Sequence, residues 1–319
     1  MKFAMIATGR IAQTALAPAL GVAEGAELWS VLSRDANRAA EFAARHGARA
    51  PQPAYSDLET LLADPELDAV VIASPDGLHA EQTIASARAG KHVLVEKPMA
   101  TDRASARAMV EACEAAGVTL GVAYHVRWHV GHRMLKAQAQ AGRFGTLRHM
   151  RLHWSFAAPD ASNWRASDAM TRWWGLSGVG THCLDQLRWF LRPGCGEIVE
   201  VRSLVSNKVY GGPHDETAVV AFEFESGATG EICTSVLFAG PRRMEIYGSE
   251  GYAVTENTLG PSGDGVIETH EGPLAYEPGN PYVGEVEDFV NAVRDGRPPE
   301  VDGREGERNI DLLLEAIGD

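Results

Sequence analysis

The sequence predicts a two-domain protein: an α/β domain over residues 1–122, followed over 123–319 by an α+β domain with a mostly antiparallel sheet. The length of 319 residues suggests two domains at the usual ~100 to 200 residues each. In the first part, short apolar runs alternate with longer amphipathic, alanine-rich stretches, as parallel strands alternate with crossover helices. In the second part, strand-like runs mostly follow one another through glycine-containing turns, which favours antiparallel pairing.

The expected strands of the first domain are short and apolar. They cover residues 3–7, 28–32, 69–73, 92–95 and 119–122. Between them, helices are expected over 35–46 and 78–89. Each helix is followed by a glycine, Gly47 or Gly90, and glycine readily adopts the left-handed conformation found at a helix C-terminus. This order predicts a doubly wound parallel sheet.

The second domain begins with a helix around 132–141 and a strand at 147–156, in which apolar and polar residues alternate. Such alternation is typical of a strand with one buried face. Further strands are expected at 198–205, 217–224, 229–236 and 243–247, and helices at 180–191, at 285–293 and after Asn309.

The strand at 217–224 is apolar on both faces, with Val219 and Ala221 on one and Val220 and Phe222 on the other. The few helices expected in this domain can cover one face of the sheet. We therefore expect the other face to pack against a second copy of the chain, in a homo-oligomer that is a dimer or a tetramer.

The composition excludes several classes of partner and site. There are 43 acidic residues against 29 lysines and arginines, a formal net charge of -14, so neither nucleic acid nor a membrane is expected as partner. No apolar run of about 18 residues and no signal-peptide pattern occurs, which predicts a cytoplasmic protein. Four scattered cysteines predict reduced thiols, and the histidines at 125, 129 and 132 lack a nearby carboxylate, so no metal site is expected.

The first strand leads into a turn that a dinucleotide could occupy. The turn reads Ala7, Thr8, Gly9, Arg10, Ile11 and Ala12. In the G-x-G-x-x-G/A pattern the middle glycine lets the backbone approach a pyrophosphate at a helix N-terminus, and the last small residue lets the helix pack on the strand. Gly9 and Ala12 meet these two needs, while Ala7 replaces the first glycine. Alone, the motif also fits an ordinary strand-to-helix turn.

The end of the second strand favours NADP over NAD. An NAD enzyme usually carries an acidic residue there to hold the ribose 2′-hydroxyl, whereas this chain has Ser33 and Arg34, with Arg38 one helical turn later. The two arginines would neutralise a 2′-phosphate. The alternative is that both are solvated surface residues.

Several further motifs extend along nearly the whole chain. They are Ser74-Pro75, Leu78-His79, Glu96-Lys97-Pro98, Tyr124-x-x-Arg127, Asn163-Trp164-Arg165, Gly180-Thr181-His182-x-x-Asp185 and Tyr282. In these motifs the sequence resembles the Gfo/Idh/MocA family, the group of glucose-fructose oxidoreductase and inositol dehydrogenase. The resemblance implies a Rossmann domain followed by an open-faced sheet domain, with NAD(P) bound between them and a sugar or cyclitol as substrate.

The resemblance also implies roles for single residues. Lys97 would hydrogen-bond the reacting hydroxyl, the Lys97–Pro98 peptide would often be cis, and His182 would be the acid/base that contacts substrate. The other implied cofactor contacts are Ser74, Pro75, His79, Glu96, Trp164 and Arg165, the last two near the nicotinamide. The implied substrate contacts are Tyr124, Arg127, Asp185 and Tyr282.

The chemistry of these residues agrees with the two catalytic roles. Lys97 falls at the carboxyl end of an expected parallel strand, where open α/β sheets bind their ligands, and its ammonium can donate to an alkoxide. His182 and Asp185 are three residues apart at the start of an expected helix, so the carboxylate can orient the imidazole. In isolation, a surface lysine and a structural histidine would be the commoner interpretations.

Gly178 departs from the family pattern, because members with this histidine often carry an aspartate four residues before it. We therefore assign only Lys97 and His182 as catalytic. The leading function is an NAD(P)-dependent oxidoreductase acting on a sugar, cyclitol or related ketone. Two alternatives stay open: an NAD-dependent glycosidase that works by transient oxidation and elimination, and a non-catalytic NAD(P)-sensing regulatory protein.

Overall fold

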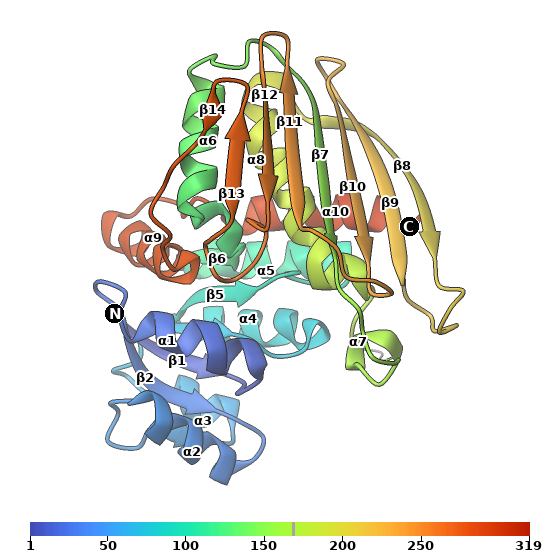
Figure 1. Ribbon diagram of the computed structural model, residues 1–319. Coiled ribbons are helices and arrows are strands. Elements are labelled where there is room, and N and C mark those ends of the chain that lie inside the picture. Colours follow the sequence, from blue (N-terminus) through green and yellow to red (C-terminus); the bar gives the residue numbers. More distant parts are fainter. Residues whose placement is uncertain (168–169) are drawn as a thin grey trace. The chain divides into compact units, whose positions relative to one another are not determined.

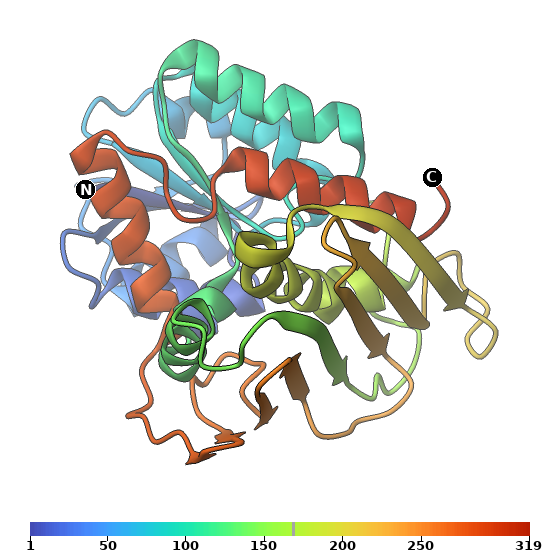
Figure 2. The same cartoon turned by 90° about the horizontal axis from the view of Figure 1, so that it is seen from above.

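The computed structural model describes residues 1–167 and 170–319. Contacts divide the chain into two compact units (Figures 1 and 2). Unit 1 is Met1–Tyr124 with Tyr282–Ile310, and unit 2 is His125–Pro281 with Asp311–Asp319. Compared with the expected domains, the main difference is that residues 282–310 lie in unit 1.

Helix α9 (Pro281–Asp295) explains this difference. Its residues in the hydrophobic cluster of unit 1 are Tyr282, Val286, Phe289 and Val290. The rings of Phe3 on the first strand and Phe289 lie 6.0 Å apart between centroids. At Gly121 an added Cβ would come within 2.9 Å of the Phe289 ring, so the helix packs directly on this sheet. Contacts between residues nearly 300 positions apart cannot be inferred from local periodicity.

Unit 1 contains a six-stranded parallel sheet in the order β3-β2-β1-β4-β5-β6. The strands are β1 (Lys2–Ile6), β2 (Glu27–Leu32), β3 (Ala54–Tyr55), β4 (Ala69–Ile72), β5 (His92–Glu96) and β6 (Leu120–Ala123). The predicted doubly wound sheet is confirmed. Its order reverses between β1 and β4, and ligands of such sheets bind outside the carboxyl ends of the strands at that point.

The helices of unit 1 follow the expected pattern. Besides α9 they are α1 (Ala17–Leu20), α2 (Ala36–His46), α3 (Leu58–Leu62), α4 (His79–Arg88) and α5 (Arg103–Ala116), and a π-helical turn (Ala12–Leu16) precedes α1. Asp35 caps α2 by accepting a hydrogen bond from the Arg38 backbone N–H at 3.0 Å. Gly47 ends the same helix at φ +69°, as expected for a left-handed C-terminus.

Unit 2 contains an eight-stranded sheet in the order β14-β13-β12-β11-β7-β10-β9-β8. The strands are β7 (Leu147–Ser155), β8 (Ile198–Ser206), β9 (Thr217–Phe224), β10 (Thr229–Ser235), β11 (Arg243–Gly248), β12 (Tyr252–Glu256), β13 (Val266–Thr269) and β14 (Gly272–Pro273). All neighbours are antiparallel except β7 and β10, which confirms the mostly antiparallel sheet. Along β7, Met150, Leu152 and Trp154 are buried, as their alternation predicted.

Helix α8 (Thr181–Cys195) lies on one face of this sheet (Figures 1 and 2). Leu184, Leu187 and Leu191 are fully buried, and an added Cβ on Gly230 of β10 would lie 2.5 Å from the Leu187 side chain. The close approach fixes the helix against the sheet. The other helices of this part are α6 (Val130–Gln140), α7 (Trp164–Ser167) and α10 (Gly303–Glu315), which crosses the division at residue 310.

Candidate functional site

The turn after β1 has a backbone that suits a dinucleotide. Ala7 has φ +80°, a conformation that costs a non-glycine residue about 1–2 kcal/mol. The backbone at this position therefore favours glycine, the residue that the G-x-G-x-x-G/A pattern places here. At Gly9 an added Cβ would meet no atom within 4 Å in the described chain. Thr8 is buried, Ile11 is half-buried and Arg10 is exposed. The open space beside Gly9, next to the start of a helix, fits the approach of a pyrophosphate.

The end of β2 presents two arginines. Ser33 is buried, whereas Arg34 and Arg38 are exposed and form no ion pair within the residues that the structure describes. The nearby carboxylate of Asp35 is engaged in capping α2. Both guanidinium groups are therefore available to a ligand.

His79 connects the loops that follow β4 and β5. The ring is fully buried, with Nδ1 at 2.9 Å from the Pro98 carbonyl oxygen and Nε2 at 2.9 Å from the Ser74 carbonyl oxygen. The Ser74 hydroxyl also donates to Gln82 Oε1 at 2.7 Å, and Pro75 is half-buried beside it. The position of His79 thus supports the two loops from within.

The loop after β5 carries Glu96 and Lys97. Glu96 is buried and accepts a hydrogen bond from the Lys97 backbone N–H at 3.2 Å. Lys97 is half-buried at the carboxyl end of the strand, and the Lys97–Pro98 peptide is cis. Tyr282 is buried in the core of unit 1, and its pKa is raised by burial, with added repulsion from Glu96 and Glu285. Tyr124 is buried and is the last residue of the first segment of unit 1.

In unit 2, aromatic rings surround His182 on the first turn of α8. The Trp154 ring stacks on the imidazole, with centroids 5.4 Å apart and planes 23° apart, and the His125 ring meets it edge-on at 4.8 Å. Asp185, one turn later, forms a buried bidentate pair with Arg127, at 2.8 Å to Nε and 2.6 Å to Nη2. The carboxylate expected to orient His182 is thus held by a cation.

The Trp164–Arg165 segment is attached to the turn before α8. The Arg165 guanidinium lies 4.1 Å from the centroid of the Trp164 ring, and its Nε donates to the Ser177 hydroxyl at 3.0 Å. Gly178 follows directly, and an added Cβ there would lie 3.5 Å from the Phe156 ring. That is an ordinary contact, so the position has room for a Cβ.

The sequence analysis missed Asp215. Its carboxylate accepts hydrogen bonds from the backbone N–H groups of Trp174 and Leu176, each at 2.7 Å. Burial raises its pKa to about 7. No local motif marks this residue, because its partners lie about 40 positions away in the chain.

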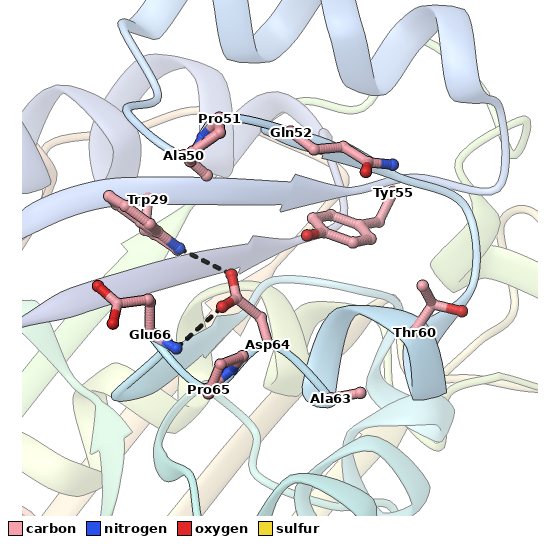
Figure 3. A pocket seen from close by; sticks show the side chains of 10 residues that line it. All are labelled: Trp29, Ala50, Pro51, Gln52, Tyr55, Thr60, Ala63, Asp64, Pro65 and Glu66. Atoms are coloured by element: carbon pink, nitrogen blue, oxygen red, sulfur yellow. Dashed lines mark hydrogen bonds between the residues drawn. The ribbon is translucent and has the colours of Figure 1, made fainter.

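A surface cavity of about 600 Å³ in unit 1 involves none of these residues. It is lined by Trp29, Ala50, Pro51, Gln52, Tyr55, Thr60, Ala63, Asp64, Pro65 and Glu66 (Figure 3). Asp64 accepts a hydrogen bond from Trp29 Nε1 at 2.8 Å. Among the residues described, no group of three or more His, Cys, Asp or Glu side chains is placed to hold a metal ion, and no helix is long and apolar enough to cross a membrane.

Comparison with known proteins identifies the family. The model of an oxidoreductase family with an NAD-binding Rossmann fold matches residues 1–124, and the GFO/IDH/MocA C-terminal domain matches residues 132–254. A 1,5-anhydro-D-fructose reductase of Ensifer adhaerens is 30% identical over 89% of this chain and 86% of its own length. The chain belongs to the Gfo/Idh/MocA family of oxidoreductases. The predicted family, fold class and NAD(P)-dependent oxidoreductase activity are confirmed.

Other similar proteins cover almost the whole chain. A D-xylose 1-dehydrogenase (NADP(+)) of Haloferax volcanii is 30% identical over 99% of this chain and 97% of its own. The WlbA dehydrogenase of Bordetella pertussis, solved with NADH and UDP-GlcNAcA, has a TM-score of 0.84 at 27% identity, covering 100% and 95% of the two chains. An aldose-aldose oxidoreductase of Caulobacter crescentus has a TM-score of 0.93 at 22% identity, covering 100% and 96%, and shows the fold alone.

Proposed function

We propose that the protein interconverts a secondary alcohol of a sugar or cyclitol and the corresponding ketone, with NADP(H) as the preferred cofactor. The position of Lys97 carries this proposal. It stands at the carboxyl end of β5, the edge where doubly wound sheets bind their ligands. The names of relatives support the substrate class: 1,5-anhydro-D-fructose reductase, D-xylose 1-dehydrogenase and myo-inositol 2-dehydrogenase.

The proposed chemistry divides between cofactor and protein. When bound, the nicotinamide supplies the hydride acceptor or donor. The Lys97 ammonium donates a hydrogen bond to the reacting oxygen and stabilises its developing negative charge. His182 accepts the hydroxyl proton during oxidation and returns it during reduction. The stacked Trp154 ring restricts rotation of the imidazole, and the Arg127–Asp185 pair beside it is proposed to bind substrate hydroxyl groups.

The preference for NADP(H) rests on Arg34 and Arg38. Charge-assisted hydrogen bonds to phosphate contribute roughly 1.5–3 kcal/mol each. Arg34→Asp should therefore weaken NADP(H) binding about tenfold or more and leave NAD(H) binding unchanged, since about 1.4 kcal/mol is a factor of ten. Titration of both cofactors measures this. A wild-type protein that strongly prefers NAD(H) would contradict the proposal.

A substrate panel tests the reaction itself. Pyranoses, cyclitols and aldonic substrates are offered with NAD and NADP separately, and the absorbance of the reduced cofactor is followed. We expect turnover with at least one class, and His182→Asn should lower kcat by about 10² to 10⁴ while cofactor affinity is kept. Tight cofactor binding without net turnover, together with release of a free sugar from a glycoside, would favour the glycosidase instead. Full activity of His182→Asn would remove His182 from the mechanism.

We also propose a cytoplasmic homo-oligomer. Leu204, Val219, Tyr247 and Tyr252 are exposed, and the strand registers place them on one face of the eight-stranded sheet, opposite the buried face of β7. A second copy of the chain is the proposed cover of these apolar side chains. Analytical ultracentrifugation at micromolar concentration should show a dimer or tetramer, and a monomer mass would refute this. The four free thiols are consistent with the proposed cytoplasmic location.

A further inference from the structure

The helix that carries His182 begins with a segment of weak helical propensity. Gly175, Gly178 and Gly180 fall within six residues, around a π-helical turn (Leu176–Gly180) that leads directly into α8. Glycine is less favourable than alanine in a helix, because it loses more backbone freedom on folding. The conformation of this entry turn must therefore be fixed from outside the turn.

Asp215 supplies external contacts to the backbone of this turn, in addition to the hydrogen bond from Arg165 to the Ser177 hydroxyl. Its Oδ1 and Oδ2 accept hydrogen bonds from the backbone N–H groups of Trp174 and Leu176, each at 2.7 Å, and its carbonyl oxygen accepts one from Gly175 at 3.2 Å. Such N–H groups at a helix start have no acceptor within the helix, and a carboxylate there is favoured by the helix dipole. An added Cβ on Gly175 would lie 2.9 Å from Asp215 Oδ2, so the glycine allows the carboxylate to approach.

Glu216, the next residue, makes a contrasting set of contacts. It is also buried, and its carboxylate accepts hydrogen bonds from the backbone N–H groups of Val209, Tyr210 and Gly211 at 2.8, 2.7 and 2.9 Å. Glu216 thus fixes its own loop, while Asp215 reaches the helix. The two neighbours form a natural matched pair for experiment.

Asp215 is not explained by stability alone. Burial raises its pKa to about 7, although backbone N–H donation acts in the opposite direction. An ionised carboxylate in this position is therefore less favourable than in water. Both oxygens of the side chain are nevertheless directed at the backbone N–H groups that begin the entry turn, which favours a role in positioning this turn.

We propose that Asp215 is a positioning residue of the active site: it clamps the entry turn and so holds His182, about two helical turns further on, in the orientation that proton transfer requires. This inference rests on the proposed function. A misplacement of about 1 Å can cost about 10²-fold in rate. The clamp and the stacked Trp154 ring then fix the imidazole from two directions.

The test compares Asp215→Asn with Glu216→Gln in the full-length protein. Asparagine keeps the size of the side chain but has one acceptor oxygen instead of two. It can therefore accept a hydrogen bond from only one of the backbone N–H groups of Trp174 and Leu176. We expect Asp215→Asn to lower kcat about 10- to 100-fold, to leave the dissociation constant of NADP(H) within twofold, and to accelerate amide hydrogen exchange over residues 174–182. Glu216→Gln should keep kcat within twofold. If Asp215→Asn does not fold, Asp215→Ser, which retains one acceptor, takes its place.

Each outcome decides between the two proposals. If His182→Asn is impaired but Asp215→Asn keeps the wild-type kcat, the positioning role is overturned and the proposed function stands. If Glu216→Gln loses as much activity as Asp215→Asn, a general loss of loop structure explains both and overturns the clamp. If His182→Asn keeps the wild-type kcat, the proton-transfer site fails, and the role of Asp215 fails with it.

Discussion

The buried carboxyl group of Asp215 should make the stability of unit 2 depend on pH. Its pKa rises from the ordinary 3.8 to about 7, because burial outweighs the hydrogen bonds from the backbone. Between these values the folded chain holds a proton that the unfolded chain releases. The contribution of this proton to stability is fully present below about pH 4 and is lost as the pH rises to about 7.

The size of the effect follows from the shift. About three pKa units, at roughly 1.4 kcal/mol per unit, correspond to about 4 kcal/mol. Asp215→Asn removes the titrating group. We therefore expect the free energy of unfolding of Asp215→Asn, minus that of the wild type, to increase by about 4 kcal/mol between about pH 4 and about pH 8.

Denaturant unfolding at closely spaced pH values measures this difference. Fluorescence is a suitable signal because Trp173 and Trp174 are buried in unit 2. The control is Asp160→Asn, since Asp160 is an exposed residue of unit 2 whose pKa is lowered by hydrogen bonds from Ser162. Both its folded and its unfolded pKa lie below about pH 4, so its difference should stay nearly constant between about pH 4 and about pH 8. A difference for Asp215→Asn that stays constant or decreases with pH would refute the reasoning.

Three further substitutions test other parts of the structure. Gly178→Asp should narrow the substrate range and move the acidic limb of the kcat/KM profile to higher pH, because a carboxylate one turn before the proposed base raises the pKa of that base; an unchanged panel and profile would contradict this. Asp185→Asn should lower the free energy of unfolding by about 3–5 kcal/mol, because it removes the bidentate carboxylate partner of the buried Arg127 charge. A loss below about 1 kcal/mol in denaturant unfolding would contradict this. Gly230→Ala should lower the free energy of unfolding by about 1–3 kcal/mol, because the added methyl group overpacks against Leu187. Leu187→Ala should then lower it less in the Gly230→Ala variant than in the wild type. Purely additive losses would show that the two residues do not touch.

The elements of the fold could be predicted because their signals are local. Short apolar runs identified strands of the parallel sheet, and alternation of apolar and polar residues identified strands of the second sheet. Glycines such as Gly47 marked the ends of helices. Four strands were missed. Strands β3 and β14 have two residues each, which carry no period. In β12 and β13 an apolar side chain, Tyr252 or Val266, also stands on the exposed face, which weakens the alternation. The parallel pairing of β7 with β10 was also beyond local inference, since it depends on which strands become neighbours.

The candidate site was predictable only where a motif lies in one stretch of chain. The turn around Gly9 was found from its place at a strand end, and Lys97 was found from the family resemblance. Both lie at the carboxyl edge of the parallel sheet. Asp185 was expected to orient His182. Its pairing with Arg127 was not predicted, because the two residues are 58 positions apart in the chain. Asp215 was missed for the same reason. Hydrogen bonds between distant segments depend on tertiary packing, which sequence spacing does not encode.

The division of the chain has a consequence for synthesis on the ribosome. Unit 1 is discontinuous, because its first part ends at Tyr124 and resumes only at Tyr282. The apolar surface that Val286, Phe289 and Val290 cover on the first sheet stays open until α9 has been made. At about 5–20 residues per second this interval lasts roughly 10 to 30 seconds, and during it the nascent chain would expose a partly formed core that chaperones could bind.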